Sequence, residues 1–153
     1  MMNVRRIHHA GIPVSNLARS LSFYARVFGV APEFVAEYGH SSLAVNLRVP
    51  DPRMKIAMLK LADDITLELL EYTSPPPEPL RSRDCDVGVT HVCLEVDDID
   101  AAYDELRAKG VDVYAEPYSE PAIGPFSGSK WLFFKDPDGV TFELNEQGGV
   151  RDG

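Results

Sequence analysis

The sequence predicts an α+β fold built from two tandem copies of a strand–helix–three-strand unit, which we call a βαβββ module. The first observation is a near-repeat of two strand-like segments, ITLELLEY at residues 65–72 and VTFELNE at residues 140–146. The second is that HAGIPVSNL at residues 9–17 aligns with HVCLEVDDI at residues 91–99. Repetition of this kind indicates duplicated supersecondary units.

The repeat also sets the expected organisation of the chain. A length of 153 residues with 44% hydrophobic side chains suits one domain with a buried core. The aligned histidines are 82 residues apart and the aligned glutamates 75, so the two halves differ by a few loop residues. We therefore expect a single domain over residues 1–153, with one module at 6–73, a linker at 74–88 and a second module at 89–147.

In the first half, residues 6–14 are expected to form a strand and residues 17–28 an amphipathic helix. The preceding Ser15-Asn16 pair supplies a helix cap, and Gly29 ends the helix. The apolar stripe of this helix comprises Leu17, Leu21, Tyr24 and Phe28. Further strands, rich in β-branched and aromatic residues, are expected at residues 32–38, 53–60 and 65–72. Residues 39–52 match neither pattern.

The second half follows the same order. The Asp97-Asp98 pair replaces the earlier cap, a helical stripe starts at Ile99, and Gly110 ends the helix. Residues 116–129 are rich in Pro, Gly and Ser and are expected to be a loop, and the DPDG sequence at 136–139 is expected to be a hairpin turn. The remaining strands are expected at residues 111–114, 130–135 and 140–146.

The linker contains the run PPPEP at residues 75–79, which cannot join a sheet interior and favours an extended, stiff chain. We expect a plain connector here, with a rim over a pocket as the alternative.

Composition argues against several classes of partner and location. Fifteen basic and 24 acidic residues give a net charge of −9, which disfavours nucleic acid and anionic lipid. No apolar run approaches the roughly 18 residues of a membrane span, and the first six residues lack the apolar core of a signal peptide. Cys85 and Cys93 have no metal or redox spacing, so we expect reduced thiols in a cytoplasmic protein.

Four residues at equivalent places in the two halves form the candidate site. His9 and His91 lie on the first strands, and Glu68 and Glu143 lie on the last. A histidine or glutamate alone on a strand is more often packed or solvent-exposed than a ligand. A carboxylate within an apolar strand is costly unless it is paired, however, and two at matching points suggest a shared partner. Two imidazoles and two carboxylates suit one divalent ion, such as Zn, Ni, Co, Mn or Fe, with open positions for water or substrate.

The neighbours of these residues define the expected pocket. Strand alternation places Gly11 beside His9, and Cys93 and Glu95 beside His91, on the inward face. The adjacent strand is expected to wall the pocket with Trp131, Phe133 and Phe134.

Two alternatives concern single residues. His8 adjoins His9 and points to the other face; the repeat favours His9, but the residues alone leave open which of them is the ligand. Cys93 is disfavoured as a nucleophile, because the second half holds no histidine other than His91 to activate it.

The motifs extend over residues 6–147. They are HAGIxV from His9, SxxFYxxxFG from Ser20, ELL from Glu68, HxxxxVDDI from His91 and FxDPDGxxxEL from Phe134. Together they resemble the vicinal oxygen chelate superfamily. This group contains glyoxalase I, methylmalonyl-CoA epimerase, extradiol dioxygenases, fosfomycin-resistance enzymes and bleomycin-binding proteins.

The resemblance implies paired βαβββ modules that form a curved mixed sheet around a metal cleft, in a glyoxalase-like fold. It implies that His9, Glu68, His91 and Glu143 are the metal ligands. It further implies a metal-dependent lyase, isomerase or epimerase of the glyoxalase type, which stabilises an enolate or enediolate of a small carbonyl substrate. Glu143, in preference to Glu68, is then expected to take the α-proton. We also expect a homodimer.

Two other functions stay open: an Fe(II) ring-cleaving dioxygenase, and a non-catalytic small-molecule binding protein of the drug-resistance type. Dioxygenases resemble a three-ligand His-His-Glu pattern, so Glu68 counts against the first. Pro13 stands where glyoxalase I carries an arginine associated with glutathione binding. A glutathione hemithioacetal is therefore expected to be a poor substrate.

Overall fold

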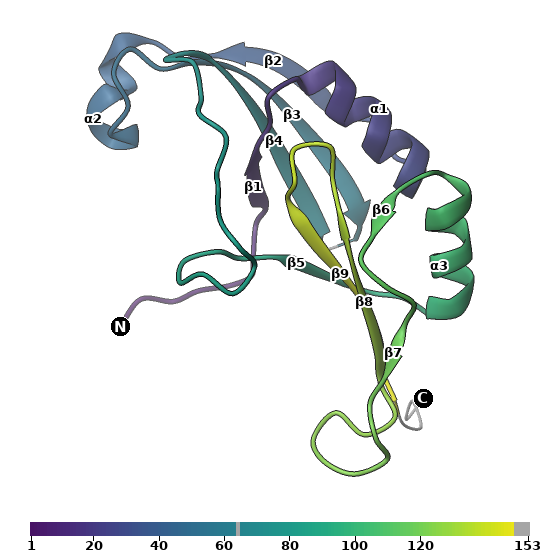
Figure 1. The fold of residues 1–153 in the computed structure, drawn as a ribbon. Helices are drawn as coiled ribbons and strands as arrows, with labels where there is room; N and C mark the ends of the chain where they lie inside the picture. Colours follow the sequence, from purple (N-terminus) through teal and green to yellow (C-terminus); the bar gives the residue numbers. More distant parts are fainter. Residues whose placement is uncertain (64, 149–153) are drawn as a thin grey trace. The chain divides into compact units, whose positions relative to one another are not determined.

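The computed structural model describes residues 1–63 and 65–148. By its contacts the chain divides into two compact units, Met1–Leu80 and Arg81–Gly153, and the described residues of each contain a sheet of their own (Figure 1). Within the described ranges, no helix has the length and apolar character that crossing a membrane requires.

The first unit is a four-stranded mixed sheet in the order β1-β4-β3-β2. Strand β1 (Ala10–Pro13) runs parallel to β4 (Ile65–Ser74), while β3 (Arg53–Ala62) is antiparallel to β4 and to β2 (Phe34–Tyr38). Helix α1 (Leu17–Phe28) packs on one face of this sheet (Figure 1). The core between them contains Leu17, Phe23, Tyr24, Val27, Ala57, Leu59, Leu67 and Leu69.

Helix α1 has the predicted bounds because both of its ends are fixed locally. The Asn16 side chain accepts a hydrogen bond from the Arg19 N–H at 2.8 Å, as an N-cap does. Gly29 has φ +70° and donates its N–H to the Ala25 carbonyl at 2.9 Å, which closes the last turn.

Strand β1 is shorter than the strand predicted over residues 6–14. Its parallel ladder with β4 pairs Ala10 with Leu67 and ends where Pro13 meets Leu70. Residues 6–9 precede this ladder as exposed chain, so that part of the prediction is wrong. The unassigned residues 39–52 contain a 3₁₀ turn, Ser41–Leu43, and a short helix α2, Ala44–Leu47.

The second unit repeats the arrangement with one addition. Its sheet has the order β5-β9-β8-β6, with β7 paired to β8, and helix α3 packs on one face (Figure 1). The elements are β5 (Val92–Glu95), α3 (Ile99–Ala108), β6 (Asp112–Val113), β7 (Tyr118–Ser119), β8 (Lys130–Lys135) and β9 (Thr141–Glu146). Residues 116–129 are therefore not wholly loop, because Tyr118 pairs across the strands with Trp131.

The hairpin between β8 and β9 is the turn that the DPDG sequence predicts. Asp136 is buried, and its carboxylate accepts hydrogen bonds from the Asp138 N–H at 2.9 Å and the Val140 N–H at 2.8 Å. This side chain holds the turn that sets β9 in register with β8.

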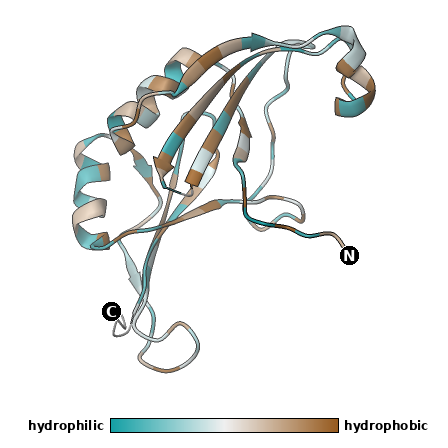
Figure 2. Ribbon diagram, turned by 180° about the vertical axis from the view of Figure 1, so that it is seen from behind, coloured by the Kyte–Doolittle hydropathy of each residue, from teal (hydrophilic) through white to brown (hydrophobic). Residues whose placement is uncertain are grey.

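Each sheet thus has one face covered by its own helix; we call the opposite one the open face of that unit. Residues two apart on a strand share a face. In Figure 2, hydrophobic and hydrophilic residues are interspersed along the strands of both units. In the second unit, the buried residues Leu132, Phe134, Phe142 and Leu144 face α3, which leaves the residues between them on the open face.

Candidate metal centre

The first unit brings His9 and Glu68 together on its open face. His9 lies just before β1, and Gly11 in β1 pairs with Glu68 in the middle of β4. The His9 Nε2 lies 3.3 Å from a Glu68 carboxylate oxygen, and the two side chains are 36% and 24% exposed. A Cβ at Gly11 would lie 3.7 Å from that oxygen, so a longer side chain there would cover the carboxylate. Glycine at this position leaves Glu68 accessible.

His8 lies on the other side of the His9 ring. The His8 Nδ1 is 2.8 Å from the His9 Nδ1, so the two nitrogens of His9 face different partners. A hydrogen bond at one ring nitrogen fixes the orientation and tautomer of the other. The structure thus places His9, and not His8, against Glu68.

The second unit holds the equivalent pair. His91 lies just before β5, and Cys93 in β5 pairs with Glu143 in β9, as Gly11 pairs with Glu68. The His91 Nε2 lies 2.9 Å from a Glu143 carboxylate oxygen, and the side chains are 47% and 17% exposed. The His91 ring also contacts the Phe133 ring edge-to-face at 5.5 Å between centroids.

Cys93 takes the place of Gly11 in this unit, and its thiol hydrogen-bonds to Glu143. Part of Cys93 is solvent-exposed, yet desolvation and the Glu143 carboxylate raise the pKa of the thiol to about 11. It therefore stays protonated near neutral pH, which agrees with the expectation that Cys93 is no nucleophile.

The geometry of each pair fits two ligands of one ion. For metal–ligand distances of about 2.1 Å and angles of about 90–110°, neighbouring donor atoms lie about 3.0 to 3.4 Å apart. The two observed separations, 2.9 and 3.3 Å, are close to this range. Among all the described residues, no group of three or more His, Cys, Asp or Glu is placed to hold an ion, so the structure shows two separate histidine–glutamate pairs.

One residue expected to wall the pocket lies elsewhere. Phe134 is fully buried and stacks on Phe142 with ring centroids 5.4 Å apart, on the face that α3 covers. Trp131 and Phe133 are half-buried, and Phe133 lies on the open face against His91. Consecutive residues on a strand point to opposite faces, so Phe133 and Phe134 could not both face the pocket.

The sequence analysis did not predict a role for a second pair of matched carboxylates. Glu71 accepts a hydrogen bond from the Leu17 N–H at 2.7 Å, and Glu146 accepts one from the Ile99 N–H at 2.9 Å. Leu17 and Ile99 are the first residues of α1 and α3. The ELLE and ELNE sequences were the available signal, because an offset of three residues puts the second glutamate on the opposite face.

We expect Glu71→Ala and Glu146→Ala each to lower the free energy of unfolding by about 1 to 3 kcal/mol, because each leaves a helix-terminal N–H without its acceptor. Urea unfolding followed by circular dichroism measures this, with Glu78→Ala in the linker as the control. Unfolding midpoints equal to that control would show that the two carboxylates do not anchor the helices.

Part of the linker is fixed to the second unit. Asp84 accepts hydrogen bonds from the Tyr114 hydroxyl at 2.6 Å and the Thr141 hydroxyl at 2.7 Å, and Lys135 Nζ lies 3.5 Å away. The hydrogen bond from Tyr114, followed by that from Thr141, lowers the pKa of Asp84. Hydrogen bonding to Tyr114 and the nearby Asp84 charge raise the pKa of Lys135. The connector therefore has an anchoring point at Asp84.

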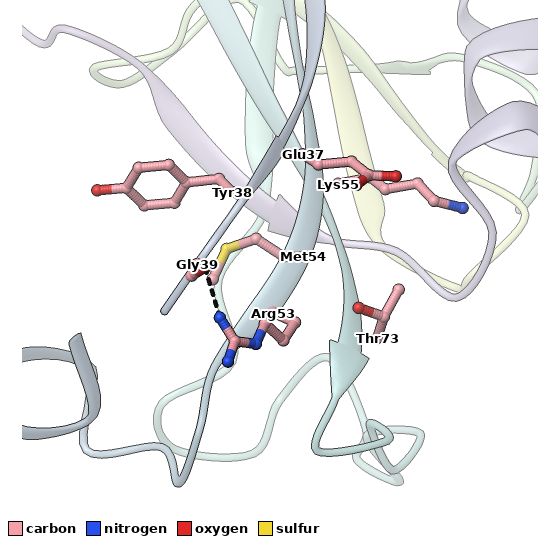
Figure 3. Close-up of a pocket in the computed structure, with 7 residues that line it drawn as sticks. All are labelled: Glu37, Tyr38, Gly39, Arg53, Met54, Lys55 and Thr73. Atoms are coloured by element: carbon pink, nitrogen blue, oxygen red, sulfur yellow. Dashed lines mark hydrogen bonds between the residues drawn. The ribbon is translucent and has the colours of Figure 1, made fainter. Parts of the chain in front are cut away.

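A pocket of about 320 Å³ lies elsewhere in the first unit (Figure 3). It is lined by Glu37, Tyr38, Gly39, Arg53, Met54, Lys55 and Thr73. In Figure 3 the Arg53 guanidinium points toward Gly39, and it donates a hydrogen bond to that carbonyl at 2.9 Å. Met54 lies four residues along β3 from Met58, the partner of Glu68, or about 13 Å at the usual strand rise. This pocket is separate from the His9–Glu68 pair.

Known proteins share both the sequence pattern and the fold. The chain is 33% identical over 142 residues to a 2-epi-5-epi-valiolone epimerase from Actinomyces sp., covering 90% of this chain and 77% of that protein. It is 31% identical over 144 residues to the lactoylglutathione lyase GLX1 of Arabidopsis thaliana, covering 94% of this chain and 45% of the plant protein. The crystal structure of a glyoxalase family protein from Bacillus cereus matches with a TM-score of 0.79 over 97% of both chains, at 19% identity.

The crystal-structure match bears on the fold alone, and it confirms the glyoxalase-like α+β architecture predicted from the repeat. A family model described as the glyoxalase/bleomycin resistance protein/dioxygenase superfamily matches residues 6–144, nearly the whole chain. The expected superfamily is therefore confirmed: the chain belongs to the glyoxalase/bleomycin resistance protein/dioxygenase superfamily.

Proposed function

We propose that this protein is a metal-dependent lyase, isomerase or epimerase that moves a proton next to the carbonyl of a small substrate. The observation that carries the proposal is the recurrence of one histidine–glutamate pair at equivalent positions of two units, at 3.3 and 2.9 Å. The names of the relatives, an epimerase and a lactoylglutathione lyase, support the same reaction classes.

In this proposal His9, Glu68, His91 and Glu143 together hold one divalent ion: Zn, Ni, Co, Mn or Fe. When bound, the ion would polarise the substrate carbonyl and stabilise negative charge that develops on its oxygen. The histidines bind through Nε2, the nitrogen that each directs at its glutamate. We also propose a cytoplasmic homodimer as the working form.

The proton transfer falls to a carboxylate of this chain. Glu143 is the preferred base and Glu68 the second candidate, because a carboxylate within reach of the α-carbon can accept its proton. Glu143 is the less exposed of the two, at 17% against 24%, and shares its face with Phe133. A less hydrated carboxylate is a stronger base toward a carbon acid.

Purified protein loaded with each metal in turn, and screened anaerobically in deuterated water with small carbonyl compounds, tests this function. We expect exchange of the α-proton with solvent, seen by NMR, only when metal is present. Stoichiometric consumption of dioxygen would instead identify a ring-cleaving dioxygenase. Tight binding of a small molecule in the absence of metal and turnover would identify a binding protein of the drug-resistance type.

We further expect the methylglyoxal–glutathione hemithioacetal to be a poor substrate. A guanidinium is the best partner for a glycyl carboxylate, since its planar fork donates two charge-assisted hydrogen bonds. Pro13 offers neither charge nor donor, and the equivalent residue of the second unit, Glu95, would repel a carboxylate. The assay is the absorbance rise of the thioester product with metal-loaded protein. A kcat/KM of about 10⁵ M⁻¹s⁻¹ or more would contradict the expectation.

A further inference from the structure

The open face of the second unit carries a row of aromatic rings that begins at His91. Phe133 contacts His91 at 5.5 Å between ring centroids, and Trp131 contacts Phe133 at 5.4 Å. Tyr118 follows Trp131 at 5.0 Å. We infer that this row, which we call the aromatic row, binds a flat, uncharged ring carried by the substrate beside its carbonyl group. The inference rests on the proposed function and names the substrate class of that site.

The register of the sheet makes the row continuous with the candidate metal centre. Phe133 in β8 pairs with Glu143 in β9, so the first ring of the row lies beside the carboxylate of the pair. Trp131 is two residues earlier on β8 and therefore shares the face of Phe133. Tyr118 in β7 pairs with Trp131 and extends the row to the edge of the sheet.

The rings are accessible and held in place. Trp131 and Phe133 are half-buried, and Tyr118 is 49% exposed. The Trp131 Nε1–H donates a hydrogen bond to the Glu120 carboxylate at 2.9 Å, which satisfies the polar edge of the indole and fixes its plane. Rings with fixed orientation and exposed surface suit offset or edge-to-face contact with another ring.

The charges around the row favour an uncharged ring. Lys135 is the lysine of β8 that shares the open face with Phe133, and it is paired with the Asp84 carboxylate of the same unit. An anionic group such as a phosphate would compete with Asp84 for the Lys135 ammonium group, and it would lie near the acidic Glu120. An uncharged ring meets no such competition, so the charges around the row favour a ring without charge.

Two α-keto acids without α-protons test the inference by binding alone. Benzoylformate carries a planar ring next to its vicinal oxygens, and trimethylpyruvate carries a bulky apolar group that is not planar. We expect nickel-loaded protein to bind benzoylformate about tenfold more tightly than trimethylpyruvate by isothermal titration calorimetry. This tenfold preference corresponds to about 1.4 kcal/mol, within the range of aromatic pairing.

Phe133→Leu keeps the apolar volume but removes the ring, and we expect it to reduce the tenfold preference to less than about threefold. Phe126→Leu makes the same change at a loop residue that is 70% exposed, and it should leave the preference intact. Trp131→Leu serves as a second test if Phe133→Leu does not fold. If the protein binds nickel but binds the two acids with equal affinity, the inference is overturned and the proposed function is unaffected.

A failure of nickel to bind would count against the proposed function instead. The two titrations are then repeated on the metal-free protein, where a benzoylformate preference that Phe133→Leu removes still supports the aromatic row. Equal or absent binding of both acids in that experiment overturns the inference as well.

Discussion

Replacing Glu143 with glutamine is expected to lower the rate of α-proton exchange by about 10³-fold, within the range attributed to a positioned general base. Glutamine preserves the shape of the side chain, but its amide cannot accept the proton. The measurement is NMR of the exchanging carbonyl compound in anaerobic deuterated water, with metal at saturating concentration. A parallel titration of metal affinity separates loss of the base from loss of a ligand.

Glu146→Gln is the matched control for this experiment. Glu146 lies three residues further along β9, on the face toward α3, where it accepts the Ile99 N–H. The same chemical change there should alter exchange by less than about threefold. Equal losses in the two variants would show that the effect comes from a disturbed strand, and wild-type exchange in Glu143→Gln would assign the base elsewhere.

Loss of the histidine ligand gives the second large effect. We expect His91→Ala to weaken binding of the divalent ion by about 10²-fold or more, since the site loses one of four donors. Metal at 100 times its dissociation constant stabilises the native state by about 2.7 kcal/mol. For a chain of this size such a gain raises the Tm by about 5 to 10 °C. Differential scanning calorimetry with and without metal should show that rise in the wild type and little of it in the variant.

His40→Ala provides the comparison. His40 is exposed, precedes the turn Ser41–Leu43 and contacts Ser42 rather than a glutamate. Its removal should leave the metal-induced rise unchanged. A full metal-induced rise in His91→Ala would place the ion outside the predicted ligand set.

Much of the fold was predictable because local signals coincide with the tertiary contacts. Helix α1 has the expected bounds because the cap residues and the apolar stripe in the sequence indicate the same ends. Strand β8 also has the bounds predicted for it. Strand β1 and the short strand β7 were harder, since each exists only where a distant strand supplies a ladder. Hydrophobicity alone also placed Phe134 on the wrong face of β8, which the backbone alternation corrects.

The duplicated sequence located each histidine opposite its glutamate, because aligned halves share one register. The repeat shows that Glu71 and Glu146 occupy equivalent positions. Their helix-anchoring role could be predicted only once it was known which face of the sheet each side chain occupies. The anchoring of Asp84 could not be predicted, because its partners Tyr114 and Thr141 are 30 and 57 residues away in sequence.

Metal stoichiometry in two matched variants tests most directly whether both pairs share one ion. Wild-type protein, Glu68→Gln and Glu143→Gln are dialysed against the same metal solution, and bound metal is counted by elemental analysis. Shared coordination predicts about one ion per chain in the wild type and, after dialysis, almost none in either variant, because each glutamine replaces a carboxylate of the same site with a neutral, weaker donor. Two ions in the wild type with one retained in each variant, or no ion in any of the three proteins, would contradict the account.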